Sequence, residues 1–83
     1  MSNLIKVNGE KPFSISSLVF VIGESSSGYT LEMSVDCIDG GEASDWAECS
    51  DAIPANKIHK YMFNAKGCWF RLRGNTGEVI VRF

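Results

Sequence analysis

The stretch that decides the fold is residues 29–37, Tyr-Thr-Leu-Glu-Met-Ser-Val-Asp-Cys. Every second side chain in it is apolar, and the apolar set is Tyr29, Leu31, Met33, Val35 and Cys37. A period of two is typical of a strand with one face on a core and the other in water, whereas a helix would scatter these side chains round its axis. The stretch therefore predicts a half-buried β-strand.

The same alternation returns elsewhere in short segments that turn-forming residues separate. We expect strands at residues 4–7, 13–22, 29–37, 45–49, 57–63, 68–73 and 78–83. No helix-length window repeats apolar residues at helical spacing, and the strand spacing is typical of small antiparallel folds. The sequence thus predicts one all-β domain over residues 1–83, a small antiparallel β-sandwich or barrel of about seven strands.

Three finer details can also be predicted. Ser16-Ser17 is the expected place of a bulge that changes which side chains of residues 13–22 face inward. The last two strands are expected to form a hairpin across the connection Gly74-Asn-Thr-Gly77. Trp46 is expected as a large core anchor, and shared parity places further residues in the core: Leu31, Met33, Val35, Phe70, Leu72, Val79 and Val81.

Length and composition limit the class of protein. A chain of 83 residues buries little more than about 60% of the surface that its unfolded form exposes, and oligomerisation is a common remedy for that shortage. A mean hydropathy of −0.01 indicates an ordered globular domain, and a net charge of −2 argues against general nucleic-acid binding. The longest apolar run, residues 18–22, is far shorter than the roughly 20 residues of a membrane-spanning helix.

The cysteines and the acidic residues give no firm metal or disulfide signal. Cys37, Cys49 and Cys68 are odd in number and form no CxxC pair, so we expect free thiols that pack as small hydrophobic groups. Acidic residues recur at every third position, and the series is Asp36, Asp39, Glu42, Asp45, Glu48 and Asp51. A calcium site is conceivable, but the spacing does not match an EF-hand, and a solvated loop is favoured.

Charge is divided unevenly along the chain. Residues 36–51 carry a net charge of −6, whereas residues 57–83 carry +5. Segments of opposite sign either neutralise each other within one molecule or meet across a contact between copies, and the sequence leaves both arrangements open.

A candidate interface follows from the strand at residues 68–73. Its parity turns Trp69, Arg71 and Arg73 outward, and Trp and Arg are enriched at protein–protein hot spots. Lys57 and Lys60 complete the candidate set, and Tyr61 would join Trp69 if its strand is adjacent. An outward Trp also stacks on sugars, while the simplest alternative is a half-covered Trp with arginine stems lying on it.

Catalysis has little support in the sequence. The one histidine, His59, lies beside Lys60, and no nucleophile or phosphate-binding motif is recognisable. We therefore expect a protein that is not an enzyme, with no catalytic residue, no cofactor and no metal.

Residues 31–41 (Leu-Glu-Met-Ser-Val-Asp-Cys-Ile-Asp-Gly-Gly), Trp46 and residues 68–81 (Cys-Trp-Phe-Arg-Leu-Arg-Gly-Asn-Thr-Gly-Glu-Val-Ile-Val) form a recognisable order of strands and turns. Over about residues 29–83 it resembles small β-sandwich proteins of tailed-bacteriophage virions, of the capsid decoration and head-fibre type. In that family Asp-Gly lies closer to the Trp, whereas here five residues separate Gly40 from Trp46.

The resemblance implies a structural protein without enzymatic activity, made in the host cytoplasm and carried in the virion in many copies. Its implied partners are copies of itself, with a trimer as one arrangement, and other virion proteins; a membrane is not among them. The alternative is a carbohydrate-binding module that holds a glycan with outward aromatic side chains.

The strand pattern predicts opposite results for two neighbouring substitutions. Leu31→Asp should unfold the domain, because an unpaired charge in a core costs several kcal/mol, whereas Glu32→Ala on the outer face should be nearly silent. Far-UV circular dichroism of both variants measures this, and a helix-dominated spectrum of the unchanged protein would contradict the fold class.

Overall fold

The computed structural model describes residues 3–34, 45–63 and 68–83. This part of the chain contains no helix, and its strands are β1 (Leu4–Asn8), β2 (Phe13–Ser14), β3 (Val19–Ile22), β4 (Thr30–Ser34), β5 (Ala47–Glu48), β6 (His59–Met62), β7 (Trp69–Arg73) and β8 (Glu78–Arg82). The predicted all-β, antiparallel fold is confirmed.

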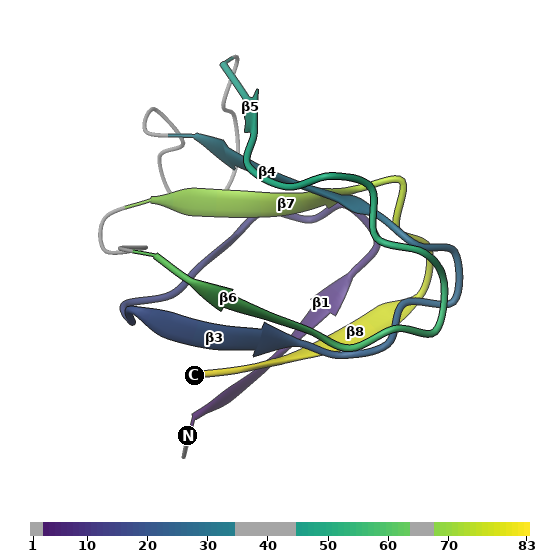
Figure 1. The fold of residues 1–83 in the computed structure, drawn as a ribbon, viewed down its shortest axis with the longest axis horizontal. Coiled ribbons are helices and arrows are strands. Elements are labelled where there is room, and N and C mark those ends of the chain that lie inside the picture. The colour runs from purple at the N-terminus through teal and green to yellow at the C-terminus, as the bar shows by residue number, and fades with distance from the viewer. Residues whose placement is uncertain (1–2, 35–44, 64–67) are drawn as a thin grey trace.

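The strands form two four-stranded sheets that pack as two layers (Figure 1). Sheet A has the order β1-β8-β3-β6 and sheet B the order β2-β7-β4-β5, with antiparallel pairing throughout. The pairs are nested, since β1 pairs with β8, β2 with β7, β3 with β6 and β4 with β5. Eight strands nested in this way across two sheets form a jelly roll.

Nested pairing moves the chain from one sheet to the other at almost every connection, and two predicted details are wrong for this reason. The predicted strand 13–22 is split, because β2 lies in sheet B and β3 in sheet A. In place of a bulge, the chain crosses between the layers, and the Ser17 hydroxyl donates to the carbonyl oxygen of Val19 at 2.7 Å. The C-terminal hairpin is also wrong, since β7 and β8 lie in different sheets and residues 74–77 cross between them.

The core lies between the sheets and contains most of the predicted set. Buried there are Leu31, Phe70, Leu72, Val79 and Val81, as expected, together with Val7, Phe13, Ile15, Phe20, Ile22, Tyr29, Ile53 and Tyr61. Met33 packs against this core while partly exposed, and Val35 lies outside the described residues. Phe20 is the centre of an aromatic cluster, with ring centroids of Tyr61, Phe63 and Phe70 at 5.2, 5.4 and 5.5 Å.

The crossing loops at one end of the sandwich are bound to one another by polar side chains. Buried Ser25, in the connection from β3 to β4, lies 2.5 Å from Oδ1 of Asn75 in the connection from β7 to β8. Asn75 also donates from Nδ2 to the carbonyl oxygen of Gly9, in the connection from β1 to β2, at 2.9 Å. One buried amide thus joins three crossings.

Two glycines with positive φ should differ in their response to alanine. Gly28 has φ +76°, and a Cβ there would lie 2.6 Å from the carbonyl oxygen of Ile53, whereas Gly74 has φ +90° with open space around it. We expect Gly74→Ala to cost about 1–2 kcal/mol, for the left-handed backbone alone, and Gly28→Ala to cost more, because the Ile53 backbone must also move. Urea unfolding followed by tryptophan fluorescence measures both, and equal losses would contradict this packing.

Candidate interaction surface

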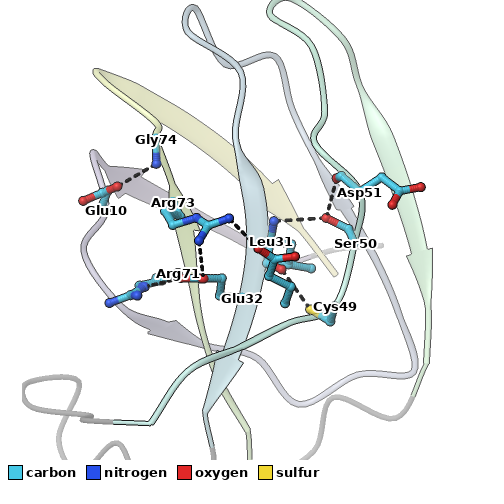
Figure 2. A network of polar contacts seen from close by, with 10 residues as sticks. Glu10, Leu31, Glu32, Cys49, Ser50, Asp51, Arg71, Arg73 and Gly74 are labelled. Carbon is cyan, nitrogen blue, oxygen red and sulfur yellow. Dashed lines mark hydrogen bonds and ion pairs between the residues drawn. The ribbon is translucent and has the colours of Figure 1, made fainter.

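A network of ion pairs lies on the outer face of sheet B (Figure 2). The register places Glu32 on β4 opposite Arg71 on β7 and opposite Glu48 on β5. Nε of Arg71 donates to Oε1 of Glu32 at 2.6 Å, while Arg73 lies 3.3 Å from Glu32 and donates to Glu48 at 2.6 Å. Arg73 therefore bridges two carboxylates that would otherwise repel each other across neighbouring strands.

The prediction that the Glu32 side chain faces solvent is wrong. Its parity is outward as expected, but it is only 4% exposed. Two guanidinium groups meet its carboxylate, and this pairing is what a buried charge requires. Period-two alternation indicates the face on which a side chain lies, but it does not indicate what covers that face.

Trp46 is part of this outer arrangement and not the predicted core anchor. The guanidinium carbon of Arg71 lies 4.5 Å from the centroid of the Trp46 ring, a cation–π contact, and the Trp46 side chain is half-buried. Arg71 already points away from the core toward Glu32, so a ring stacked on it lies on the outside of sheet B. Trp46 thus packs against Arg71 on the outside of sheet B.

The five candidate interface residues do not form one surface. Trp69, Arg71 and Arg73 lie on the outside of sheet B, where Trp69 is half-buried and the two arginines bind Glu32 and Glu48. The hydrogen bond to Glu48 raises the pKa of Arg73 above its usual range. Lys60 is exposed on β6 of sheet A, and Lys57 is exposed before that strand. For Arg71 and Arg73, the charge is balanced within the molecule.

Tyr61 does not join Trp69, because the condition that their strands be adjacent is not met. Tyr61 belongs to β6, which pairs with β3 in sheet A, whereas Trp69 belongs to sheet B. The Tyr61 ring faces inward, is 5% exposed and stacks on Phe20. It therefore offers no ring to a sugar bound on the outside of sheet B.

Sheet A presents a different outer face, which the sequence interpretation missed. The large hydrophobic side chains that the structure leaves exposed, by 40% to 70%, are Leu4, Leu18, Ile58, Met62 and Ile80. Leu4, Met62 and Ile80 lie on β1, β6 and β8 of sheet A, and the other two directly precede β3 and β6. Ile80 could have been found from its parity, because it alternates with the core residues Val79 and Val81.

This apolar face has a shallow hollow and unpaired cations. Val21, Gly23, Ile58, Ile80 and Arg82 line a hollow of about 230 Å³. At Gly23 the backbone N–H donates to the carbonyl oxygen of Ile80 at 2.8 Å, and a Cβ would lie 3.0 Å from that same oxygen, so glycine keeps the floor open. None of the ion pairs between described residues involves the basic side chains here, Lys6, Lys60 and Arg82.

The two cysteines in the described part of the chain are half-buried. Cys49 and Cys68 are free thiols, as expected, while Cys37 lies outside the described residues. The Cys49 thiol donates to the carbonyl oxygen of Leu31, and burial, as the largest cause, raises its pKa to about 11. A thiol that is protonated at neutral pH is a poor nucleophile, so Cys49 does not supply one.

The acidic series does not form a metal site within the described part of the chain. Asp45, Glu48 and Asp51 are exposed, and the other members, Asp36, Asp39 and Glu42, lie outside the described residues. Among the residues that the structure describes, no three His, Cys, Asp or Glu side chains are placed to share a metal ion. A metal-binding role for these acidic residues has no geometric support here.

Comparison with protein families, with curated proteins and with solved structures found no significant match. In the described ranges no helix has the length and apolar character needed to cross a membrane. The fold and the two outer faces are therefore the features of the molecule that bear on its function.

The ion-pair network predicts that two glutamates on the same face differ in importance. Glu32→Ala should cost about 2 kcal/mol or more, because it leaves Arg71 and Arg73 without their shared, buried partner, even though both arginines keep some solvent. Glu48→Ala, at an exposed ion pair, should cost less than about 1 kcal/mol. Chemical denaturation of both variants tests this, and a silent Glu32→Ala would show that the pairing does not stabilise the fold.

Proposed function

We propose that this chain is a structural protein without enzymatic activity that works through protein–protein contacts, as a capsid-decoration or fibre component of a bacteriophage virion. The observation that carries the proposal is the outer face of sheet A, where Leu4 on β1 and Ile80 on the neighbouring β8 are exposed, together with Met62 on β6 at the other edge of the sheet. Exposed apolar patches bordered by charged residues are typical of protein interaction sites. The phage setting is supported by the resemblance of residues 29–83 to small virion proteins.

The fold is compatible with this role but does not select it. Jelly rolls occur in viral capsid proteins and also in lectins and cupins, so the likeness is an analogy at the level of architecture. The apolar face is the more specific support, because a protein built only to be soluble would carry polar side chains there.

A carbohydrate-binding module is the second candidate, and one observation favours it. Both tryptophans are associated with the outside of sheet B, near the carboxylates and guanidinium groups of the ion-pair network. Against it, Arg71 covers one face of Trp46, and Glu32 is already bound by two arginines. A glycan platform needs free aromatic faces and free polar groups, so we rank this function below assembly.

The proposed function predicts that the chain is incorporated into virus particles through sheet A. Ile80→Lys should abolish incorporation, because it places a charge in the centre of the apolar face while the inward Val79 and Val81 stay in the core. The control is Asp51→Lys, because Asp51 is exposed and lies away from this face. Mass spectrometry of particles purified from cells that express each variant measures incorporation. Absence of the unchanged chain from the particles would refute the virion role, and a glycan that quenches tryptophan fluorescence would favour the alternative.

A further inference from the structure

The outer face of sheet A has an acidic end and a basic end. On the outward side of β8, Glu78, Ile80 and Arg82 follow one another, while the inward Val79 and Val81 are buried. Glu24 lies with Glu78 beside the hollow at one end, and the register places Arg82, Val21 and Lys60 in one row at the other end. Between the two ends lie Ile80 and Ile58 beside the hollow, with Lys6 opposite Ile80 on the edge strand β1.

The outward residues of β8 are therefore complementary to a second copy of the same strand. Glu78 and Arg82 lie two positions on either side of Ile80, so reversing the strand places each charge over its opposite. Four residues of strand span roughly 13 Å, which lets both pairs form beside a central contact between the two Ile80 side chains.

Two copies can stack with their strands aligned about either of two two-fold axes, and the charges favour one of these axes. A two-fold axis along the strands would place Glu78 over Glu78 and Arg82 over Arg82, which is repulsive. An axis perpendicular to the strands, through Ile80, places the acidic end over the basic end. The register pairs Lys6 with Ile80, so this axis also places Lys6 over Lys6 of the second copy, which is repulsive. Lys6 is exposed on the edge strand β1, where solvent screens its charge, and the two Glu78–Arg82 pairs outweigh this one contact.

We propose that the occupant of this face is a second copy of the chain, packed sheet A against sheet A about a two-fold axis through Ile80, with Glu78 of each copy paired with Arg82 of the other. This inference rests on the proposed use of this face for protein contacts and names the partner. The two-fold arrangement differs from the trimer that the resemblance implies.

The size of the face predicts a weak dimer. Four strands of up to five residues cover roughly 19 by 17 Å, so two copies bury about 650 Å² plus the additional area from Leu18, Ile58 and Met62. This area lies below that of stable complexes and in the range of transient ones. We therefore expect a monomer–dimer equilibrium that changes between micromolar and millimolar protein.

A charge-exchange experiment tests the arrangement in the whole protein. Sedimentation equilibrium would be measured for the unchanged chain, for Glu78→Arg, for Arg82→Glu and for the double variant E78R/R82E. Each single change should weaken dimerisation at least tenfold, and the double change should restore it, because the pairs re-form with their signs exchanged. The control is the double variant Asp51→Arg with Lys11→Glu, which exchanges charges at exposed positions outside the outward rows of sheet A.

The possible results separate this inference from the proposed function. A monomer at all concentrations, or a dimer that E78R/R82E does not restore, overturns the two-fold arrangement. If such a monomer is still incorporated into virus particles through sheet A, the proposed function stands and the partner is a different protein. A restored dimer supports the arrangement, even if the chain is absent from particles. Circular dichroism of each variant shows whether a loss of dimer reflects unfolding.

Discussion

The structure depends on one topological constraint, the nesting of strand pairs from both ends of the chain toward β4 and β5. Nesting places consecutive strands in different sheets, so the backbone must cross between the layers again and again. Each crossing turns backbone groups away from the sheets, and they need other partners. Asn75 and Ser25 join these crossings at one end, which explains why two of the few buried polar side chains lie in connections and not in strands.

The outer faces of the two sheets differ in how far the chain's own side chains cover them. On sheet B, Arg71 and Arg73 extend over Glu32, and Trp46 stacks on Arg71, so the face is covered by the chain's own side chains. On sheet A the cations have no acidic partner among the described residues, and apolar side chains stay in water. A partner on sheet A would remove exposed apolar side chains from water, whereas a partner on sheet B would first have to disturb existing ion pairs.

The sequence is sufficient to predict most of the strands, the antiparallel all-β class and most of the core, because the period of two is a local signal. It could not distinguish a hairpin from a crossing, since Gly74-Asn-Thr-Gly77 permits a reversal into either sheet. It also misplaced Trp46, which contacts Arg71 far away in the chain, and it left open the side of the sandwich for Tyr61, whose ring stacks on the equally distant Phe20. Of the candidate interface, parity correctly turned Arg71 and Arg73 outward, but their carboxylate partners became visible only once the strand register was known.

The small size of the domain limits how much apolar surface it can bury. In the described part of the chain, β2 and β5 have only two residues each, and one core lies between the two sheets. A core of this size supports the domain with little excess, and oligomerisation is a common source of further apolar burial for small domains. The outer face of sheet A is large enough for a weak contact only. Weak contacts become effective when many copies are held side by side, because each bound neighbour raises the local concentration of the next. The proposed role in a repetitive assembly is therefore compatible with a small jelly roll whose exposed apolar face is large enough for a weak contact only.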